Sequence, residues 1–266
     1  MNTKASRRLQ LFYLALGALA LVAIVLRSIA LARFFNDNTG YFTKGALPII
    51  VRLLEVLGIA LCAALPFLIK KDTPKPTNAP LSIAGLFACT LCALTFTVSA
   101  TYFLVRRASI PTPNIILLLA ALFLLASTAY FINQFRNKQE TDTALPFGYI
   151  AILGVALLLA TLYFDLTTPM NAPHKVSLQI ALLSVMIAIL YELRSMTNAP
   201  HLRAQAAVCG FAFFACAVTG IPNAIAFVLG TFDKTFYLLA DFVCVALALY
   251  FGVKCATLCQ NKETDQ

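Results

Sequence analysis

Residues 46–71 read ALPIIVRLLEVLGIALCAALPFLIKK, and this stretch decides the fold. It is long enough to cross a bilayer, because a spanning helix needs about 20 predominantly apolar residues. It ends in the pair Lys70-Lys71, and basic residues of this kind mark the cytoplasmic end of a span. Its first half nevertheless carries Arg52 and Glu55, which are costly groups to place in hydrocarbon. The stretch therefore predicts a membrane span that also brings polar groups into the membrane.

The composition of the whole chain gives the same answer. The 266 residues are 61% hydrophobic and 12% charged, with a mean hydropathy of +0.85. Soluble domains carry about 25% charged residues, so we expect a lipid bilayer as the surroundings of this chain. The net charge of +9 comes from basic groups at the ends of apolar runs. A nucleic-acid site needs basic groups gathered on one folded face, so we expect no nucleic-acid partner.

Eight apolar runs have the length of spanning helices, which predicts an all-α, polytopic transmembrane bundle. They lie near residues 9–32, 46–69, 81–105, 114–135, 144–166, 176–193, 204–229 and 235–259. The connections are short and polar, and none is long enough for a soluble domain. We therefore expect one integral membrane domain over residues 1–266.

The distribution of Lys and Arg predicts the orientation of the spans. Twelve of these residues flank one side and six flank the other, and Arg27 and Arg52 lie within spans. Cytoplasmic flanks carry the excess of positive charge, so we expect both termini in the cytoplasm of a cell whose plasma membrane holds the protein. As an alternative, the first run could be a signal peptide cleaved after Ala30-Leu31-Ala32, which would leave seven spans. Its apolar core, Leu9 to Leu26, is longer than the usual 7–15 residues, and Arg27 lies between this core and the small residues of the cleavage site.

Four ionisable residues gather at one level of the predicted bundle. With a rise of about 1.5 Å per residue, Arg27, Arg52 and Asp241 lie roughly 7 Å below the outer boundary, and Glu55 lies roughly 12 Å below it. Charges at this depth face the bundle interior and pair with one another. Arg52 and Glu55 are three residues apart and can pair on one helix. This leaves Arg27 to pair with Asp241, which would place the first span beside the eighth.

Two further features belong to the same outer half of the bundle. Asp165, at the end of the fifth run, could join the cluster or lie among lipid head groups. The seventh run contains Thr219-Gly220-Ile221-Pro222-Asn223. Gly and Pro two residues apart should kink or unwind a helix, and broken helices often form the substrate site of transporters. We therefore add Asn223 to the candidate residues.

Several residues at the ends of the runs receive ordinary interpretations. Glu192 lies where the sixth span is expected to reach the membrane interface, and charges are inexpensive there. His174 and His201 follow Asn-Ala-Pro in two connections, and we expect them to be solvated. Tyr237 has the position of an aromatic interface anchor.

The sequence carries no sign of a metal, a cofactor or a catalytic residue. The eight cysteines all lie in apolar runs, where packing between helices is the expected role. Cys89-x-x-Cys92 has the spacing of a metal motif, but no His or acidic residue is close to it in the sequence. Walker A, Gly-x-Ser-x-Gly and His-Glu-x-x-His motifs are missing.

The loop at residues 34–44 has aromatic residues on both sides of a turn-forming polar centre. It could lie on the membrane surface or fold over the charged residues as a lid. Arg27, the stretch Thr39-Gly40-Tyr41-Phe42 and then Ala46-Leu47-Pro48 resemble an uncharacterised group of polytopic membrane proteins from Gram-positive anaerobic bacteria. This resemblance covers about the first 50 residues, and it implies a bacterial plasma membrane and no particular chemistry.

Three functions agree with these features. The first is a permease or carrier of a small polar solute, which would bind at Arg27, Arg52, Glu55, Asp165, Asn223 and Asp241. The second is a non-catalytic structural or partner subunit of a membrane complex, in which the charges only fix packing. The third is an intramembrane enzyme acting on lipid-linked substrates, with Glu55 as acid or base. We expect the first of these and no enzymatic activity.

Overall fold

The computed structural model describes residues 3–36, 40–68, 82–106, 109–110, 112–135, 141–197, 202–231 and 235–260. The protein is an all-α bundle, and eight of its helices are long and apolar enough to cross a membrane. The predicted fold class and the eight predicted spans are therefore confirmed. The helices are α1 (Thr3–Phe34), α2 (Ala46–Leu68), α3 (Ile83–Arg106), α4 (Asn114–Phe135), α5 (Thr141–Phe164), α6 (Pro173–Met196), α7 (Leu202–Val228) and α8 (Thr235–Gln260).

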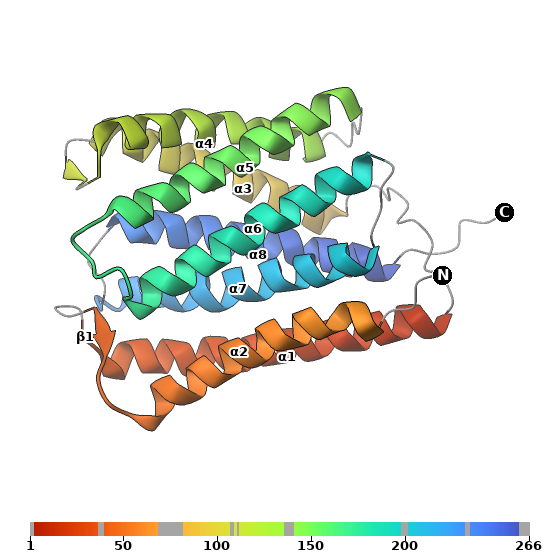
Figure 1. The fold of residues 1–266 in the computed structure, drawn as a ribbon, viewed down its shortest axis with the longest axis horizontal. Helices are drawn as coiled ribbons and strands as arrows, with labels where there is room; N and C mark the ends of the chain where they lie inside the picture. Colours follow the sequence, from red (N-terminus) through yellow and green to blue (C-terminus); the bar gives the residue numbers. More distant parts are fainter. Residues whose placement is uncertain are drawn as a thin grey trace.

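The helices lie side by side along the long axis of the molecule (Figure 1). By their contacts, six of them close into a ring. Each of α3 to α8 contacts the next helix in the chain, and α8 returns to contact α3. The pair α1 and α2 packs outside this ring, mainly against α7. The two helices outside the ring are also the least buried. In the most apolar part of α1 and of α2, 22% of the residues are buried, against 61% in α7 and in α8. The centre of the molecule is therefore formed by α7 and α8.

A small β-hairpin lies at one end of the bundle. Its strands, β1 (Phe35–Asn36) and β2 (Tyr41–Phe42), pair antiparallel between α1 and α2. Gly40 has a φ of 72°, a backbone conformation that glycine adopts without strain. We call this end of the molecule the hairpin end; α1 begins and α8 ends at the opposite end, which we call the terminal end (Figure 1).

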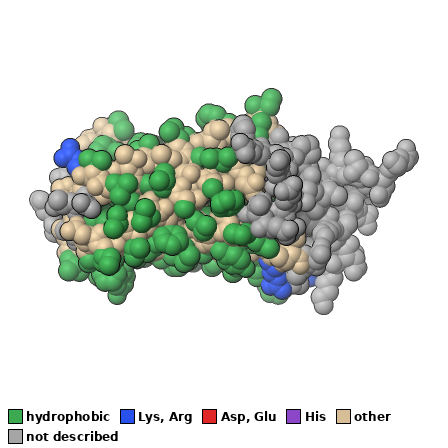
Figure 2. Space-filling model, turned by 90° about the horizontal axis from the view of Figure 1, so that it is seen from above, with side chains coloured by type: hydrophobic (Ala, Val, Ile, Leu, Met, Phe, Trp, Pro, Cys, Tyr) green, Lys and Arg blue, Asp and Glu red, His purple; other side chains and the backbone are tan. Residues whose placement is uncertain are grey.

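The outer surface has the distribution expected of a protein surrounded by lipid. Figure 2 shows apolar side chains over the length of one face, with Lys and Arg side chains only toward its ends. Large apolar residues such as Leu14, Leu53, Ile115 and Phe87 are more than half exposed. In water a surface of this kind would be an aggregation hazard, whereas in lipid it needs no cover.

The seventh span is not unwound. The Gly-x-Pro sequence predicted a helix that is either kinked or unwound, and α7 is continuous from Leu202 to Val228 with Pro222 inside it, which contradicts the unwound form. Gly220 instead allows α7 and α8 to approach closely, because a Cβ atom there would lie 2.7 Å from the backbone oxygen of Asp241 and 3.0 Å from the Cβ of Cys244. Packing against α8 therefore holds this part of α7 in a helical conformation.

Candidate functional site

Three of the predicted residues form one ion-pair cluster at the hairpin-end half of the bundle. Arg27 of α1 pairs with the Oε1 atom of Glu55 on α2, and Arg52 Nη1 lies 2.9 Å from the other oxygen, Oε2. The side chain of Arg27 is only 3% exposed, that of Glu55 14% and that of Arg52 41%. One carboxylate is thus shared by two guanidinium groups. The predicted pairing of Arg52 with Glu55 is confirmed.

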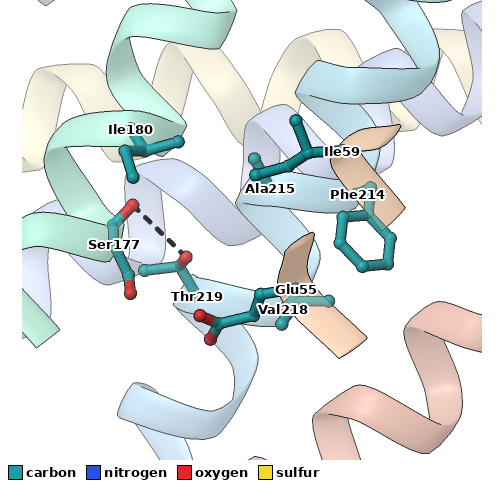
Figure 3. A pocket seen from close by; sticks show the side chains of 8 residues that line it. All are labelled: Glu55, Ile59, Ser177, Ile180, Phe214, Ala215, Val218 and Thr219. Carbon is teal, nitrogen blue, oxygen red and sulfur yellow. Dashed lines mark hydrogen bonds between the residues drawn. The ribbon is translucent and has the colours of Figure 1, made fainter. Parts of the chain in front are cut away.

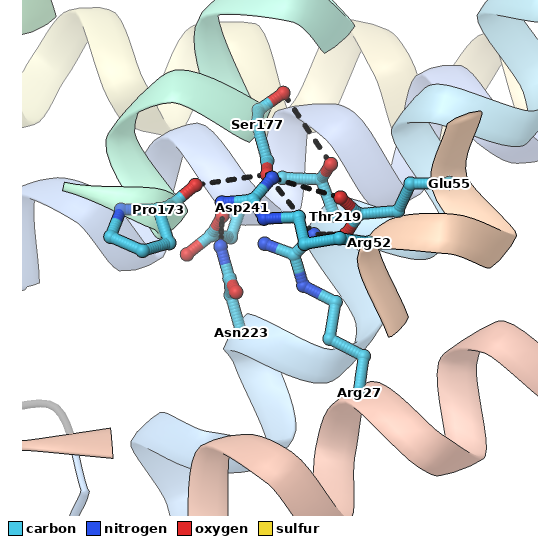
Figure 4. Close-up of polar contacts among 8 residues, drawn as sticks. All are labelled: Arg27, Arg52, Glu55, Pro173, Ser177, Thr219, Asn223 and Asp241. Carbon is cyan, nitrogen blue, oxygen red and sulfur yellow. Dashed lines mark hydrogen bonds and ion pairs between the residues drawn. The ribbon is translucent and has the colours of Figure 1, made fainter. Parts of the chain in front are cut away.

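A residue that the sequence analysis did not select, Ser177 of α6, completes this cluster (Figure 4). Its Oγ atom accepts a hydrogen bond of 3.1 Å from Arg27 Nη1 and donates one of 2.9 Å to the backbone oxygen of Pro173. Arg52 Nη1 lies 3.5 Å from the same Oγ atom. The cluster therefore connects α1 and α2 to the first turn of α6. Serines are common in apolar helices, so nothing in the sequence distinguished Ser177 from the others.

Asp241 has a different partner from the predicted one. Its Oδ1 atom accepts a hydrogen bond of 2.9 Å from Asn223 Nδ2, which joins α8 to α7. The charge of Arg27 still acts on the Asp241 carboxyl group, but the ion pair of Arg27 is made with Glu55. The prediction of an Arg27–Asp241 pair was wrong because α1 packs mainly on α7 and α2, and α7 supplies Asn223 as the nearer partner.

A small cavity adjoins the cluster (Figure 3). It has a volume of about 30 Å³ and lies over α7, with one wall from α2 and one from α6. Its lining residues are Glu55, Ile59, Ser177, Ile180, Phe214, Ala215, Val218 and Thr219. A cavity needs about 10–15 Å³ of this kind of volume to hold one water molecule. In this conformation the space is sufficient for about two or three waters and too small for a larger solute.

Asp165 belongs to a second polar group, inside the ring at the hairpin end. Its Oδ2 atom accepts a hydrogen bond of 2.6 Å from the hydroxyl of Tyr237, and its Oδ1 atom accepts bonds from the hydroxyl and the amide of Thr167, at 2.6 and 3.0 Å. Burial acts to raise the pKa of Asp165, but the hydrogen bonds from Thr167 and Tyr237 outweigh it and hold the pKa below its usual value. Tyr237 is buried, so the prediction that it anchors at the membrane interface was wrong.

Two neighbouring residues on α6 also turn inward. Lys175 is fully buried, and its Nζ atom donates to the backbone oxygens of Asp165 at 2.6 Å and of Thr168 at 3.3 Å. His174 is 7% exposed, and its ring contacts those of Phe35 and Tyr237 edge to face. The expectation of a solvated His174 was therefore wrong, because the hairpin covers it. His201 lies outside the described residues.

A third polar group, at the terminal end of the ring, was missed by the sequence analysis. Glu192 is 3% exposed. Its Oε2 atom accepts hydrogen bonds from the hydroxyls of Tyr130 at 2.6 Å and Tyr250 at 3.0 Å, and its Oε1 atom lies 3.3 Å from Lys254 Nζ. The sequence analysis treated Glu192 as an interface charge, whereas the structure buries it among these three partners. Tyrosines at depth in α4 and α8 were the signal that could have identified its partners.

The described cysteines do not take part in a cluster that could bind a metal ion. All eight are buried and carry free thiols. Among the described residues, no set of three or more His, Cys, Asp or Glu side chains is placed to hold a metal ion. The buried ionisable groups described above are therefore the three groups centred on Glu55, Asp165 and Glu192, together with the Asn223–Asp241 pair.

These features define the class of the protein as a multi-pass helical membrane protein with buried charged groups near both ends of its bundle. Beyond that class, comparison with known protein families, with functionally described proteins and with solved structures gives no match. The function must therefore be argued from the site itself.

Proposed function

We propose that the protein is a carrier of a small solute with a polar or charged group, which binds at the Arg27–Arg52–Glu55 cluster. The observation that supports this most is that Glu55 both pairs with two arginines and lines the cavity between α2, α6 and α7. Ionisable groups within spanning helices are expensive and commonly mark a substrate or ion pathway. Arg52, which is 41% exposed, is the member of the cluster that an incoming solute can reach.

The cavity volume also bears on this proposal. A space of about 30 Å³ cannot enclose a solute of several heavy atoms, so binding requires α2 and α6 to separate. These two helices both pack on α7, and they are not among the closely packed helix pairs of the described residues. Separation of α2 from α6 would therefore break few contacts, as a carrier that alternates between two conformations requires.

The cellular setting forms part of the same proposal. We infer a bacterial plasma membrane from the resemblance of about the first 50 residues, and both ends of the chain in the cytoplasm from the excess of Lys and Arg on that side. The hairpin end would then face outward, and the cluster would lie in the outer half of the membrane.

The experiment is a binding screen followed by uptake into proteoliposomes. Purified protein is heated with amino acids, carboxylates, sugars and phosphate esters, and a ligand is recognised because it raises Tm. We expect the ligand to raise Tm for wild type and for the control Arg33→Gln, whose side chain is exposed at the same end. We expect the ligand to leave the Tm of Arg52→Gln unchanged. We expect Glu55→Gln to remain folded in the membrane and to show no uptake.

Two results would contradict the carrier. One is a ligand that shifts Arg52→Gln as much as wild type, because the cluster would then not be its site. The other is full uptake by Glu55→Gln. If no solute binds while Glu55→Gln only lowers Tm, the cluster fixes packing, as in a structural subunit.

A further inference from the structure

The cavity beside Glu55 has a polar end and an apolar end. Glu55, Ser177 and Thr219 form the part that lies toward the hairpin end (Figure 3). One turn deeper along their helices, the lining changes to Ile59, Ile180 and Phe214. The space therefore runs from charged and polar groups toward the hairpin end to apolar groups nearer the bilayer centre. A lipid has the same order, with its polar head group at the surface and its acyl chains inside.

The cavity also lies on the side of the bundle that faces lipid. Its walls are α2 and α6, and its floor is formed by buried residues of α7. Apolar residues of the two wall helices are open: Val56, next to Glu55 on α2, is 63% exposed, and on α6 the lining residue Ile180 is 36% exposed and Leu183 46%. A molecule dissolved in the bilayer can thus enter sideways between α2 and α6 without crossing a polar surface.

The charges at the polar end favour an anion. Two guanidinium groups share the single carboxylate of Glu55, so these three residues carry a formal charge of +1. The Nε atom of Arg27 is buried and has no hydrogen-bond partner, although Arg27 is only 2% exposed. Asp241 is hydrogen-bonded to Asn223 on α7 and, among the described residues, forms no ion pair with either arginine. Neither arginine lines the cavity, but Nη1 of each reaches the Oγ atom of Ser177, which does. A buried donor without a protein acceptor can be satisfied by a bound molecule or by water.

The N-terminal end of α6 lies beside the same cluster, because the Oγ atom of Ser177 donates to the backbone oxygen of Pro173. The helix begins with Pro173, and its N-cap residue Ala172 provides no side-chain hydrogen bond to the helix. Helix N-termini favour negative charge. Ser177, in this first part of α6, already contacts both arginines.

We propose that the substrate of the carrier is an anionic phospholipid of the bilayer, held with its phosphate group on Arg52 and Arg27 and its acyl chain along Ile59, Ile180 and Phe214. This inference rests on the proposed carrier function at the same site, and it replaces the water-soluble solute of that proposal with a lipid. The lipid enters sideways, and its phosphate group replaces part of the interaction between Glu55 and the arginines.

The test uses the absence of Trp from the sequence. A single Trp is introduced by Leu183→Trp, at an exposed position of α6 near the cavity. In a reference protein it is introduced by Leu122→Trp, at an exposed position of α4. Each protein is placed in phosphatidylcholine vesicles with increasing fractions of phosphatidylglycerol that has brominated chains. Bromine quenches Trp fluorescence on contact, so the curve reports the lipid beside each reporter.

We expect quenching of the α6 reporter to saturate at a low fraction of the brominated lipid, and quenching of the α4 reporter to rise in proportion to that fraction. Adding Arg52→Gln should weaken the apparent affinity at α6 about fivefold, as removal of one basic group near an anionic lipid does. Adding Arg33→Gln should leave the curve unchanged.

A proportional curve at α6, or an unchanged curve with Arg52→Gln, would overturn the inference. Reversal of the quenching by inorganic phosphate would also overturn it, since the site would then take a soluble anion. Passage of fluorescent phosphatidylglycerol between the two leaflets tests the carrier separately. Saturable quenching without such passage refutes the carrier and keeps the lipid site, whereas a proportional curve with uptake of a soluble solute does the reverse.

Discussion

Single buried polar side chains connect helices that are far apart in the sequence. Arg27 connects α1 to α2 and α6, and Tyr237 connects α8 to the loop before α6. Glu192 connects α6 to α4 and α8. Between transmembrane helices such bonds are worth about 0.6–2 kcal/mol each. They therefore do more to fix which helices lie side by side than to hold the bundle together.

Glu192 should be the most sensitive of these residues to substitution. Glu192→Leu removes the acceptor of two buried tyrosine hydroxyls and the charge that Lys254 faces, and breaking a buried pair costs about 3–5 kcal/mol. We expect a loss of this size in the free energy of unfolding, measured in mixed micelles. Glu192→Gln keeps an acceptor oxygen and should lose less.

The matched control is Arg194→Leu, because Arg194 is exposed two residues further along α6. It should change the free energy of unfolding by no more than about 0.5 kcal/mol. Equal losses from Glu192→Leu and Arg194→Leu would show that the contacts of Glu192 are not needed for folding.

Asp165 should make the stability depend on pH in acid. Its pKa is held below the ordinary value of 3.8 in the folded protein. The group therefore stabilises the fold at pH values above about 4, and this contribution is lost as the pH falls through the folded pKa. Tyr237→Phe removes one of the hydrogen bonds that lower the pKa, so the Tm of this variant should fall less steeply as the pH drops below about 4. Identical slopes for Tyr237→Phe and wild type would contradict this assignment.

At the scale of the helices, close approach of α7 to α8 depends on Gly220. Gly220→Ala would place a methyl group 2.7 Å from the backbone oxygen of Asp241, and overpacking of this kind costs about 1–3 kcal/mol. Gly17 in α1 is the matched control, because nothing lies within 4 Å of a Cβ atom there. Gly17→Ala should stabilise the protein by about 0.5–1 kcal/mol, since Ala favours the helix. Two changes of the same sign in Tm would contradict this account of Gly220.

The helices were predictable from the sequence, whereas their partners were not. Apolar runs with basic ends define a span by length and composition alone, so all eight were found. The pairing of Arg52 with Glu55 was also predictable, because three residues along one helix fix their distance. Arg27 and Asp241 lie on different helices, and their partners depend on how α1, α7 and α8 pack. The burial of Glu192 was missed for a related reason. The tyrosines that contact it lie on α4 and α8, and the sequence of α6 alone does not indicate them.

At the scale of the whole molecule, α3 to α8 close a ring and α1 and α2 pack outside it. The ring holds Asp165 near one end and Glu192 near the other, and most of its buried residues are apolar. The Glu55 cluster lies where the outer pair meets the ring. This is the place where helices can separate with the smallest loss of contacts, because α1 and α2 are the least buried of the eight.

The orientation of this bundle can be tested with cysteine labelling, because all eight native cysteines are buried and should react slowly with a maleimide. Thr43 at the hairpin end and Thr197 at the terminal end are both exposed, and the hydroxyl of each donates one hydrogen bond to a nearby backbone oxygen, at 3.0 and 3.1 Å. Thr43→Cys and Thr197→Cys therefore perturb the protein to a similar degree. The excess of Lys and Arg at the terminal end predicts that this end is cytoplasmic.

With a maleimide that cannot cross membranes, intact cells should label Thr43→Cys alone, and permeabilised cells should label both variants. Labelling of Thr197→Cys alone in intact cells would invert the orientation and place the Glu55 cluster in the inner half of the membrane. Labelling of both variants in intact cells would mean that Thr43 and Thr197 lie on the same, outer side of the membrane. The carrier and the lipid site both need the hairpin end and the terminal end on opposite sides, so this last pattern would remove their common basis.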